Sequence, residues 1–347
     1  MERPLAGSPV SGLPATFAIG PVPVAPNLVL APMSGITDSA YRALVKEANP
    51  GAVGLVVTEL ISIEALARHD LRTHRMLRYL PHERPLSIQL FGAEPARMAE
   101  AAAIAQDLGA DVLDVNCGCP APKVTKKGGG AGLMREPVVL REILGALRRV
   151  LTIPFTVKLR AGWDEGSRNA VEVARMAEGE GAAMIAVHGR TRAQLYTGEP
   201  DWELIAAVKR AVGVPVVGSG DVASAAEALA RLAASGVDGI MIGRATLGNP
   251  WIFREVAALR AGRVPPPVGA RERFAAIDTL IARLAAELPA PSALGRARGL
   301  ACRMVKHVRG GAAVRELVSR APSIEAMRAI LARAADLAAV DEASAAA

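Results

Sequence analysis

The segment VNCGCP at residues 115–120 contains the residues best suited to chemistry in this chain of 347 residues. The apolar run before it is typical of a buried strand, so Asn116 and Cys119 are expected where that strand gives way to a loop. Pro120 restricts the turn that follows and so helps to present the Cys119 thiol. A neutral thiol in such a place can act as a general acid, giving a proton to a ligand bound in a pocket.

Other roles for Cys119 fit less well. Free cysteines are often buried for packing alone. A closed zinc site would need a second pair of Cys or His ligands beside the C-x-C pattern, so no metal is expected. A nucleophile would need a base partner, and the sequence shows none. The general acid is therefore the best interpretation of Cys119.

Composition limits the class of protein. The length allows one large domain and a smaller one, and no apolar segment is long enough to span a bilayer. Three cysteines make no disulfide framework, which favours a reducing cytoplasm. The net charge of +7 and the pI near 9.7 favour a polyanionic partner, although many basic proteins bind nothing anionic in particular.

The order of strands and helices predicts a (β/α)8 TIM barrel, an α/β fold. Short apolar runs are expected to be strands at residues 28–31, 54–57, 86–90, 112–115, 155–159, 184–187, 214–217 and 239–242. Helical patterns between them cover 95–108, 138–150, 170–180, 202–212 and 223–234, and Gly109, Gly181, Gly213 and Gly236 are expected at helix ends. An open doubly wound sheet is the runner-up, but no GxGxxG turn follows the first strand.

Nearly every expected strand is followed by a polar or ionisable group. In a barrel the carboxyl ends of the strands form the functional face. A barrel with only a structural role would have no need of so many polar groups on one rim. In order the strand ends carry Met33-Ser34, Glu59, Gln89, Asn116 with Cys119, Lys158, His188, Ser219-Gly220-Asp221 and Gly243-Arg244.

The remaining sequence suggests two flanking regions. Residues 1–27 are rich in Pro and Gly and read as a loose lead-in, without the pattern of a signal peptide. The barrel domain is expected over 28–262. Three prolines at 265–267 suggest a stiff linker, and residues 263–347 are expected to form this linker and a helical bundle, with breaks near 289–292 and 322–323.

The types of the rim residues suggest what the barrel binds. The glycine-containing turns at Ser219–Asp221 and Gly243-Arg244 resemble the phosphate cup that barrels form after their last two strands. Lys158 lies on an apolar strand, where it either pairs with Glu59 or Asp114 or stands beside a cofactor that becomes anionic on reduction, such as a flavin. Gln89 can donate and accept, which suits a pyrimidine edge. His188, alone, is equally typical of a satisfied barrel histidine.

The chain resembles the tRNA-dihydrouridine synthases, closest to the bacterial B type. The matching segments run in order from residue 28 to residue 255. They are LAPMSGITD, SIQLFG, DVNCGCPAPKV, VKLRAGW, HGRTRAQLYTG, SGD and MIGRATLGNPWIFRE. The resemblance implies an FMN-bound barrel that takes hydride from NADPH and reduces uridine in tRNA at the carbon 5–carbon 6 double bond.

The resemblance also implies roles for individual residues. Cys119 matches the cysteine that protonates carbon 5, and Asn116 would help to orient the target base. The expected FMN contacts are Pro32, Met33, Ser34, Gln89, Lys158, His188, Ser219, Gly220, Asp221, Gly243 and Arg244. Two departures stand out: Ser219 replaces a more usual Asn, which should leave the backbone contacts intact, and Cys117 adds a second thiol near Cys119.

Contact with tRNA should involve basic groups, since a uridine must leave its stack to reach a barrel mouth. Lys123, Lys126 and Lys127 follow the Cys119 turn, and Arg190 extends the rim. We expect Lys123, Lys126 and Arg190 to bind substrate. A further basic group lies in the helical region, at Arg296, Arg298, Arg303, Lys306 and Arg309. A solvated face is the usual role of such a cluster taken alone, but the position of the set beside the site and in the helical region favours contact with RNA.

Two other functions remain open at this point. A flavin barrel of the dihydroorotate dehydrogenase kind would share the fold and the lysine, but it acts on a small pyrimidine and needs no basic helical domain. An RNA-binding protein without catalysis would have no use for Cys119, Lys158 and Arg244. The chain is expected to be a cytoplasmic monomer, with neither a membrane nor a metal among its partners.

Overall fold

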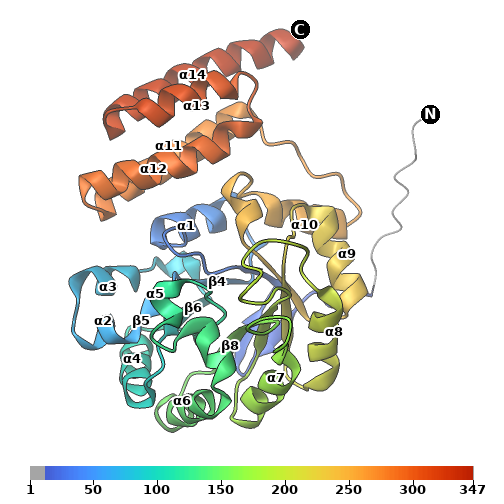
Figure 1. The fold of residues 1–347 in the computed structure, drawn as a ribbon. Helices are drawn as coiled ribbons and strands as arrows, with labels where there is room; N and C mark the ends of the chain where they lie inside the picture. Colours follow the sequence, from blue (N-terminus) through green and yellow to red (C-terminus); the bar gives the residue numbers. More distant parts are fainter. Residues whose placement is uncertain (1–11, 347) are drawn as a thin grey trace.

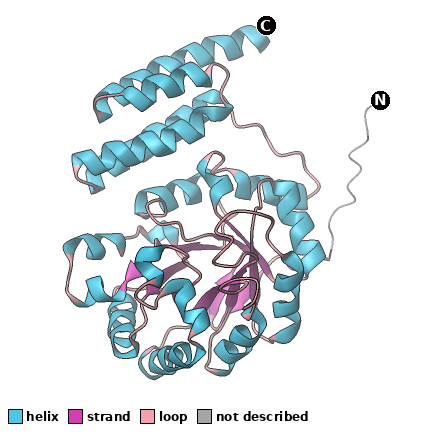
Figure 2. Ribbon diagram, in the orientation of Figure 1, coloured by secondary structure: helices cyan, strands magenta, loops and turns pink. Residues whose placement is uncertain are grey.

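The computed structural model describes residues 12–346, and their side chains except at 307 and 339–346. Within these residues, eight parallel strands form a closed barrel inside a ring of helices (Figure 2). The strands are β3 (Leu28–Leu30), β4 (Leu55–Val57), β6 (Leu86–Phe91), β7 (Val112–Cys117), β8 (Phe155–Arg160), β9 (Ile185–His188), β10 (Val216–Ser219) and β11 (Gly239–Ile242). The barrel closes because β4 pairs with β3 on one side and β6 on the other. The predicted TIM barrel is confirmed.

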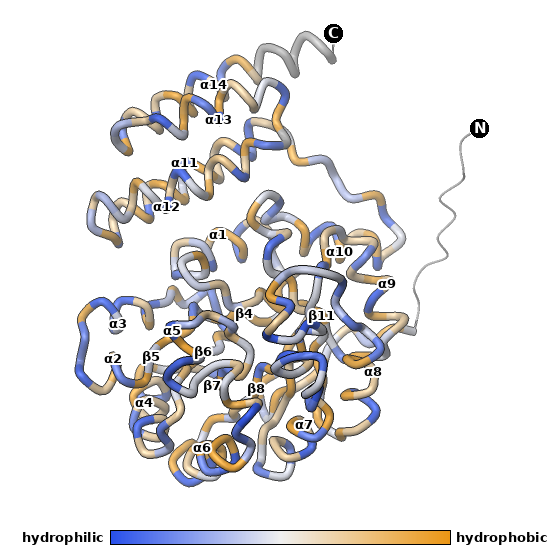
Figure 3. Tube along the Cα trace, viewed as in Figure 1, coloured by the Kyte–Doolittle hydropathy of each residue, from blue (hydrophilic) through white to orange (hydrophobic). Residues whose placement is uncertain are grey.

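Side chains alternate between the inside and the outside of the barrel, as they must along any strand. On β7, Val112 joins the inner apolar cluster, whereas Leu113, Val115 and Cys117 join the outer one beneath the helices. Figure 3 colours the chain by hydropathy and shows hydrophobic and hydrophilic residues interspersed along the barrel and its helices. The alternation therefore sends Asp114 and Asn116 inward.

Seven helices among the described residues cover the barrel. They are α1 (Ser39–Ala48), α4 (Pro95–Asp107), α6 (Pro137–Val150), α7 (Ala170–Gly179), α8 (Trp202–Ala211), α9 (Ala225–Ser235) and α10 (Ile252–Arg260). The five whose ranges were expected (α4, α6, α7, α8 and α9) begin and end within about two residues of those ranges. Gly109, Gly181 and Gly236 follow their helices with positive φ, which glycine adopts without strain. Gly213 does not, because α8 ends in extended backbone at Val212.

Short elements fill the connections between these helices and strands. They are β5 (Ile61–Ser62), α2 (Ile63–Ala67), α3 (Leu71–Met76), α5 (Pro122–Thr125) and the 3-10 turns η1 (Pro81–Glu83), η2 (Gly130–Arg135) and η3 (Arg244–Leu247). β5 pairs with β6 beyond the barrel proper. Most of these elements follow strand ends, so they build the rim.

A hairpin precedes the barrel where a loose lead-in was expected. The strands β1 (Phe17–Ile19) and β2 (Val22–Val24) pair antiparallel. Ile19 and Val24 are fully buried and pack in the inner cluster with Val29 and Met241. The hairpin thus seals the amino end of the barrel, and its short alternating pattern was hidden among prolines and glycines. Residues 1–11 of the expected lead-in lie outside the described residues.

Four helices follow residues 263–269, which form an extended connection. They are α11 (Ala270–Glu287), α12 (Ala290–Met304), α13 (Gly311–Arg320) and α14 (Ile324–Ala346), with η4 (Val305–His307) between α12 and α13. Figure 1 shows them in orange and red beside α1, which α11 contacts. The break after Met304 was not expected, because no proline marks it; Gly310 makes it possible with a φ of 71°.

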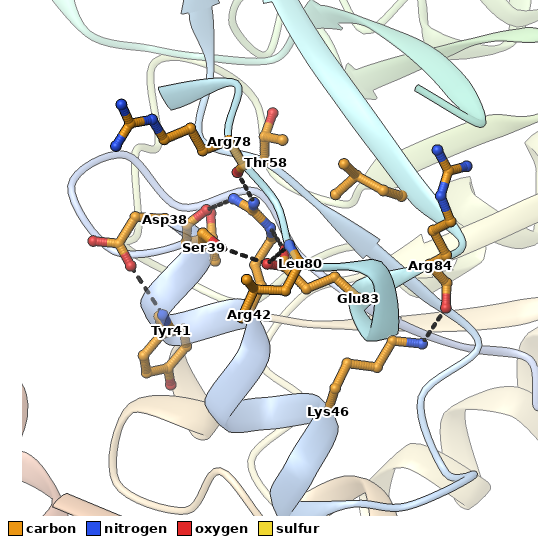
Figure 4. Close-up of polar contacts among 12 residues, drawn as sticks. Asp38, Ser39, Tyr41, Arg42, Lys46, Thr58, Arg78, Leu80, Glu83 and Arg84 are labelled. Atoms are coloured by element: carbon orange, nitrogen blue, oxygen red, sulfur yellow. Dashed lines mark hydrogen bonds and ion pairs between the residues drawn. The ribbon is translucent and has the colours of Figure 1, made fainter. Parts of the chain in front are cut away.

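A buried ion pair holds the loops beside α1. Arg42 and Glu83 have no exposed side-chain area, and Nε of Arg42 donates to Oε2 of Glu83 at 2.6 Å. The same guanidinium donates to the carbonyls of Thr37 and Arg78, each at 2.7 Å. Figure 4 shows Arg42 with Arg78 and Glu83. One side chain thereby ties the loop after β3 to the segment that leads into β6.

Glu83→Gln should lower the free energy of unfolding by about 3–5 kcal/mol, because it leaves the Arg42 charge buried without a counterion. Chemical denaturation of both proteins measures the difference. Glu100→Gln is the matched control, since Glu100 pairs with Arg97 in solvent, and it should cost no more than about 0.5 kcal/mol. Equal losses in the two variants would contradict a central role for the buried pair.

Candidate functional site

The carboxyl ends of neighbouring strands bring the expected polar residues to one rim. Gln89 is in register with Asp114, Asn116 with Lys158, and His188 with Ser219. All six side chains belong to the inward set of their strands. The parallel pairing therefore gathers residues that are up to 130 positions apart in the sequence into one cavity mouth.

Three side chains form a relay of hydrogen bonds that ends at the Cys119 turn. Nε2 of Gln89 donates to Oδ2 of Asp114 at 2.6 Å, and Nδ2 of Asn116 donates to Oε1 of Gln89 at 2.7 Å. Oδ1 of Asn116 then accepts from the Cys119 backbone N–H at 2.8 Å. Thr156 donates to Asp114 and so holds its carboxylate in place. The fixed carboxylate then determines which way the amides of Gln89 and Asn116 are oriented.

The relay changes the interpretation of two expected residues. Gln89 is fully buried and each end of its amide already has a protein partner. It therefore has only its second N–H and second lone pair for a ligand. Asn116 uses its oxygen to hold the turn that carries Cys119.

The two neighbouring thiols lie in different environments. Cys117 is the last residue of β7, has no exposed area and packs in the outer cluster under the helices. Burial, followed by the charge of Asp114, raises the pKa of Cys117 well above its usual value. Cys119 lies beyond the strand end and is partly exposed. Only Cys119 is placed to meet a ligand at the mouth.

Lys158 points to a site built for an anion. No hydrogen bond or ion pair joins it to another described residue, so the alternative pairing with Glu59 or Asp114 is absent there. Burial and, after it, repulsion from Arg160 lower the pKa of Lys158 to about 8, against attraction from Asp114 and Cys119. An unpaired cation at this depth is costly unless a ligand neutralises it.

His188 lies on β9, the strand next to that of Lys158, and is neutral. Burial, then the charges of Lys158, Arg160 and Arg190, lower its pKa to about 2. Its Nε2 is buried and has no hydrogen-bond partner in the described part of the chain. A buried ring nitrogen without a partner is rare in folded proteins and is expected where a ligand supplies the missing bond. This histidine is not a satisfied core residue.

Two turns, one after β10 and one after β11, make up the region where the sequence predicts phosphate binding. Gly220 has a φ of 147°, and a Cβ there would lie 2.5 Å from Cβ of Pro200, so only glycine fits. Asp221 forms ion pairs with Arg190 and Arg244. The side chain of Arg244 is half-exposed and lies 4.5 Å from the centre of the Tyr196 ring. Besides the Nη2 group that pairs with Asp221, the half-exposed guanidinium of Arg244 has further N–H donors that can meet an incoming anion.

Arg190 is placed differently from the expected substrate contact. Its side chain is almost fully buried, and besides Asp221 it donates to the carbonyls of Thr197 and Gly198. Nearly all of its donors are therefore used within the protein. This geometry favours a role in fixing the Asp221 turn instead of contact with a substrate.

The turn after β3 completes the rim. Pro32 and Met33 are partly exposed, and Ser34 is exposed. The hydroxyl of Thr37 accepts from the Met33 N–H at 3.0 Å, and Oε2 of Glu59 accepts from the Gly35 N–H at 2.5 Å. The turn is thus held from both sides.

Sequence reasoning missed three residues of this rim. Arg160 donates from Nε to the Gly118 carbonyl at 2.8 Å and lies 5.8 Å from the centre of the Tyr196 ring. Arg160 lies two residues after Lys158 on one strand, so its side chain points to the same face, and the sequence could have indicated this. Tyr196 and the contact of Arg296 with Glu59 were not visible, because loops and a distant helix bring them there.

The basic residues expected to contact RNA divide into two groups. Lys123 and Lys126, on and just after α5, are exposed, as are Arg303, Lys306 and Arg309. Arg296 and Arg298 instead bond within the protein, Arg296 to Asp38 and Glu59 and Arg298 to the Ala321 carbonyl. In the part of the chain that is described, no group of three His, Cys, Asp or Glu could hold a metal ion, and no helix is long and apolar enough to cross a membrane.

Lys158→Met should raise the free energy of unfolding of the flavin-free protein at pH 7 by about 1–3 kcal/mol, because the fold penalises the lysine charge. The sign follows from the lowered pKa: the penalty is complete below pH 8, shrinks as the pH rises toward 10.5 and then disappears. Urea titrations at pH 7 and pH 10 measure it. The exposed Lys127→Met serves as control, and an equal change there would contradict the burial penalty.

Known proteins resemble this chain over most of its length. The model of the dihydrouridine synthase family (Dus) matches residues 29–339. The chain is 43% identical over 238 residues to tRNA-dihydrouridine synthase B of Pseudomonas aeruginosa, covering 69% of this chain and 71% of that one. It is 44% identical over 260 residues to the probable tRNA-dihydrouridine synthase of Rhodobacter capsulatus, covering 75% and 79%.

Solved structures share the fold. Histamine dehydrogenase from Rhizobium sp. 4-9 is 14% identical, with a TM-score of 0.58 over 87% of this chain and 65% of that one. A 2-naphthoyl-CoA reductase complex is 14% identical, with a TM-score of 0.57 over 73% and 53%. The family model spans nearly the whole chain, and close relatives carry the same family name. The chain therefore belongs to the dihydrouridine synthase family of enzymes.

Proposed function

We propose that the chain reduces uridine in tRNA to 5,6-dihydrouridine, with FMN as cofactor, NADPH as reductant and Cys119 as proton donor. The observation that carries the proposal is the partly exposed Cys119, held by a buried relay at a mouth that also contains an unpaired cation and an unpaired ring nitrogen. The names of the relatives support tRNA as the substrate.

The residues present suit a flavin. The unpartnered Nε2 of His188 and the unpaired ammonium of Lys158 offer a hydrogen bond and a positive charge from one side of the mouth. The turns at Gly220 and Arg244 would hold the phosphate, and the Met33 turn would pack against the ring system. The chemistry that FMN would bring to this site, after reduction by NADPH, is hydride transfer to carbon 6 of the uracil.

The chain's own groups account for the proton. The Cys119 thiol would donate it to carbon 5, so that one hydrogen is added to each carbon of the double bond. The thiolate left behind lies within the electrostatic reach of Lys158, which stabilises it until solvent returns a proton. Asn116 and Arg160 hold the two ends of the short turn at Gly118 and Cys119, and this fixes the thiol's approach.

Binding of the tRNA would use charge on two sides of the mouth. The exposed Lys123 and Lys126 lie directly after the Cys119 turn, and Arg303, Lys306 and Arg309 lie at the end of α12 and just beyond it. Phosphate contacts of this kind give affinity without reading sequence. They would hold the RNA while one base leaves its stack and enters the barrel.

Cys119→Ala should retain FMN and lose turnover by about 10²–10⁴-fold, the usual contribution of a positioned general acid. Cys117→Ala is the matched control and should stay active, because Cys117 faces the helices. The measurement is anaerobic: the protein is reduced with NADPH, unmodified tRNA is added, and flavin reoxidation is followed together with mass spectrometry of the nucleosides.

Three outcomes separate the alternatives. Reoxidation with formation of dihydrouridine supports the proposed function. A flavin that is reoxidised only by a small pyrimidine or quinone would reject tRNA as the substrate. Loss of activity in Cys117→Ala with a normal rate in Cys119→Ala would move the proton donor to Cys117.

Reversing charge at Lys123 and Lys126 should weaken tRNA binding by about tenfold or more at low salt and flatten its salt dependence, because two phosphate contacts are lost. The flavin absorption spectrum should not change. Arg149→Glu with Arg210→Glu is the matched control, since both arginines are exposed at helix ends on the opposite face of the barrel. An unchanged tRNA affinity in the Lys123 and Lys126 variant would reject their role.

A further inference from the structure

Arg296 reaches from the C-terminal helices into the rim of the barrel. It lies on α12, and its Nη1 contacts Oδ2 of Asp38 and, at 3.2 Å, Oε1 of Glu59. The Arg296 side chain is 21% exposed, and the two carboxylates are 11% and 7% exposed. This is a largely buried contact between segments more than 230 positions apart in the sequence.

Each of the two carboxylates also accepts a hydrogen bond from a backbone N–H group, one in the turn after β3 and one at the start of the helix that follows it. The second oxygen of Glu59 accepts from the N–H of Gly35 at 2.5 Å, and Gly35 has a φ of 76°. The second oxygen of Asp38 accepts from the Tyr41 N–H at 2.9 Å and thereby caps the start of α1. One arginine thus holds the acids that fix both the turn and the helix following it.

Charge makes this arrangement depend on Arg296. Burial opposes its charge, but attraction to Asp38 and Glu59 prevails and raises the pKa of Arg296. Without the guanidinium, two largely buried carboxylates would share one corner of the mouth and repel each other. Glu59 would then be drawn toward solvent and away from Gly35.

A second contact across the same interface lacks this connection. Arg283 on α11 donates to both oxygens of Glu47 at 2.7 and 2.9 Å. Glu47 lies near the end of α1, is 41% exposed and has His82 as its other ionic partner. The Arg283–Glu47 pair therefore joins the helices to the barrel without touching the Met33–Gly35 turn.

We propose that Arg296 is a positioning residue through which the C-terminal helices hold the Met33–Gly35 turn in the shape that receives FMN. The proposal rests on the proposed function, in that FMN packs against this turn. It adds that the helical region is part of the cofactor site, in addition to any role in binding RNA.

The test is the dissociation of FMN from the purified holoprotein, followed by the fluorescence of free FMN on dilution. Arg296→Met should weaken FMN binding by about tenfold, whereas Arg283→Met should change it less than about twofold. Arg296→Lys should fall between wild type and Arg296→Met, because an ammonium can serve one carboxylate but not bridge two. Thermal unfolding shows whether Arg296→Met and Arg283→Met lose similar amounts of stability.

Equal FMN affinity in wild type and Arg296→Met would overturn the inference. So would equal weakening in Arg296→Met and Arg283→Met, since that would be a general loosening of the interface. If Arg296→Met does not fold, Glu59→Gln replaces it and should weaken FMN binding by about threefold, with no change again overturning the inference. A wild-type protein that binds no FMN would instead reject the proposed function.

Discussion

The closure of the barrel is the constraint on which the rest of the structure depends. Because β4 pairs with both β3 and β6, every strand has two neighbours and every carboxyl end faces the same rim. The strict alternation of side chains then decides which residues reach that rim. A slip of one residue in β7 would send Cys117 inward and remove Asn116 from the mouth. The set of side chains available for chemistry at the rim therefore depends on the register of the strands.

The rim combines polar groups that have hydrogen-bond partners within the protein with polar groups that have none among the described residues. Asp114, Gln89 and Asn116 bond to one another and give the Cys119 turn a fixed shape. Lys158 and His188 lie beside them without partners among the described residues, at a cost in stability. This contrast is typical of sites in which the protein supplies orientation while a ligand completes the electrostatics.

The sequence was sufficient for features that depend on local pattern. Strands and helices recur with clear periods, and the polar residues Gln89, Asn116 and His188 at the expected strand ends indicated the rim at which the structure gathers them. Contacts that depend on long loops were not accessible: the burial of Arg190 follows from carbonyls of a turn seven and eight residues later. The sealing of the barrel by β1 and β2 was missed because three-residue strands carry too little pattern. Arg296 resembled any surface arginine in the sequence, and only the fold shows that α12 brings it to Asp38, just before α1, and to Glu59, just after β4.

The separation of Cys117 from Cys119 also bears on oxidation. A disulfide requires two Cβ atoms within about 4.5 Å of each other. Cys117 packs beneath the helices, and Cys302 lies on α12 with its thiol against the Arg315 carbonyl. Neither cysteine can serve as a resolving partner for Cys119. An oxidant that enters the mouth would therefore leave Cys119 as a sulfenic acid, and its recovery would require a reducing thiol from solution.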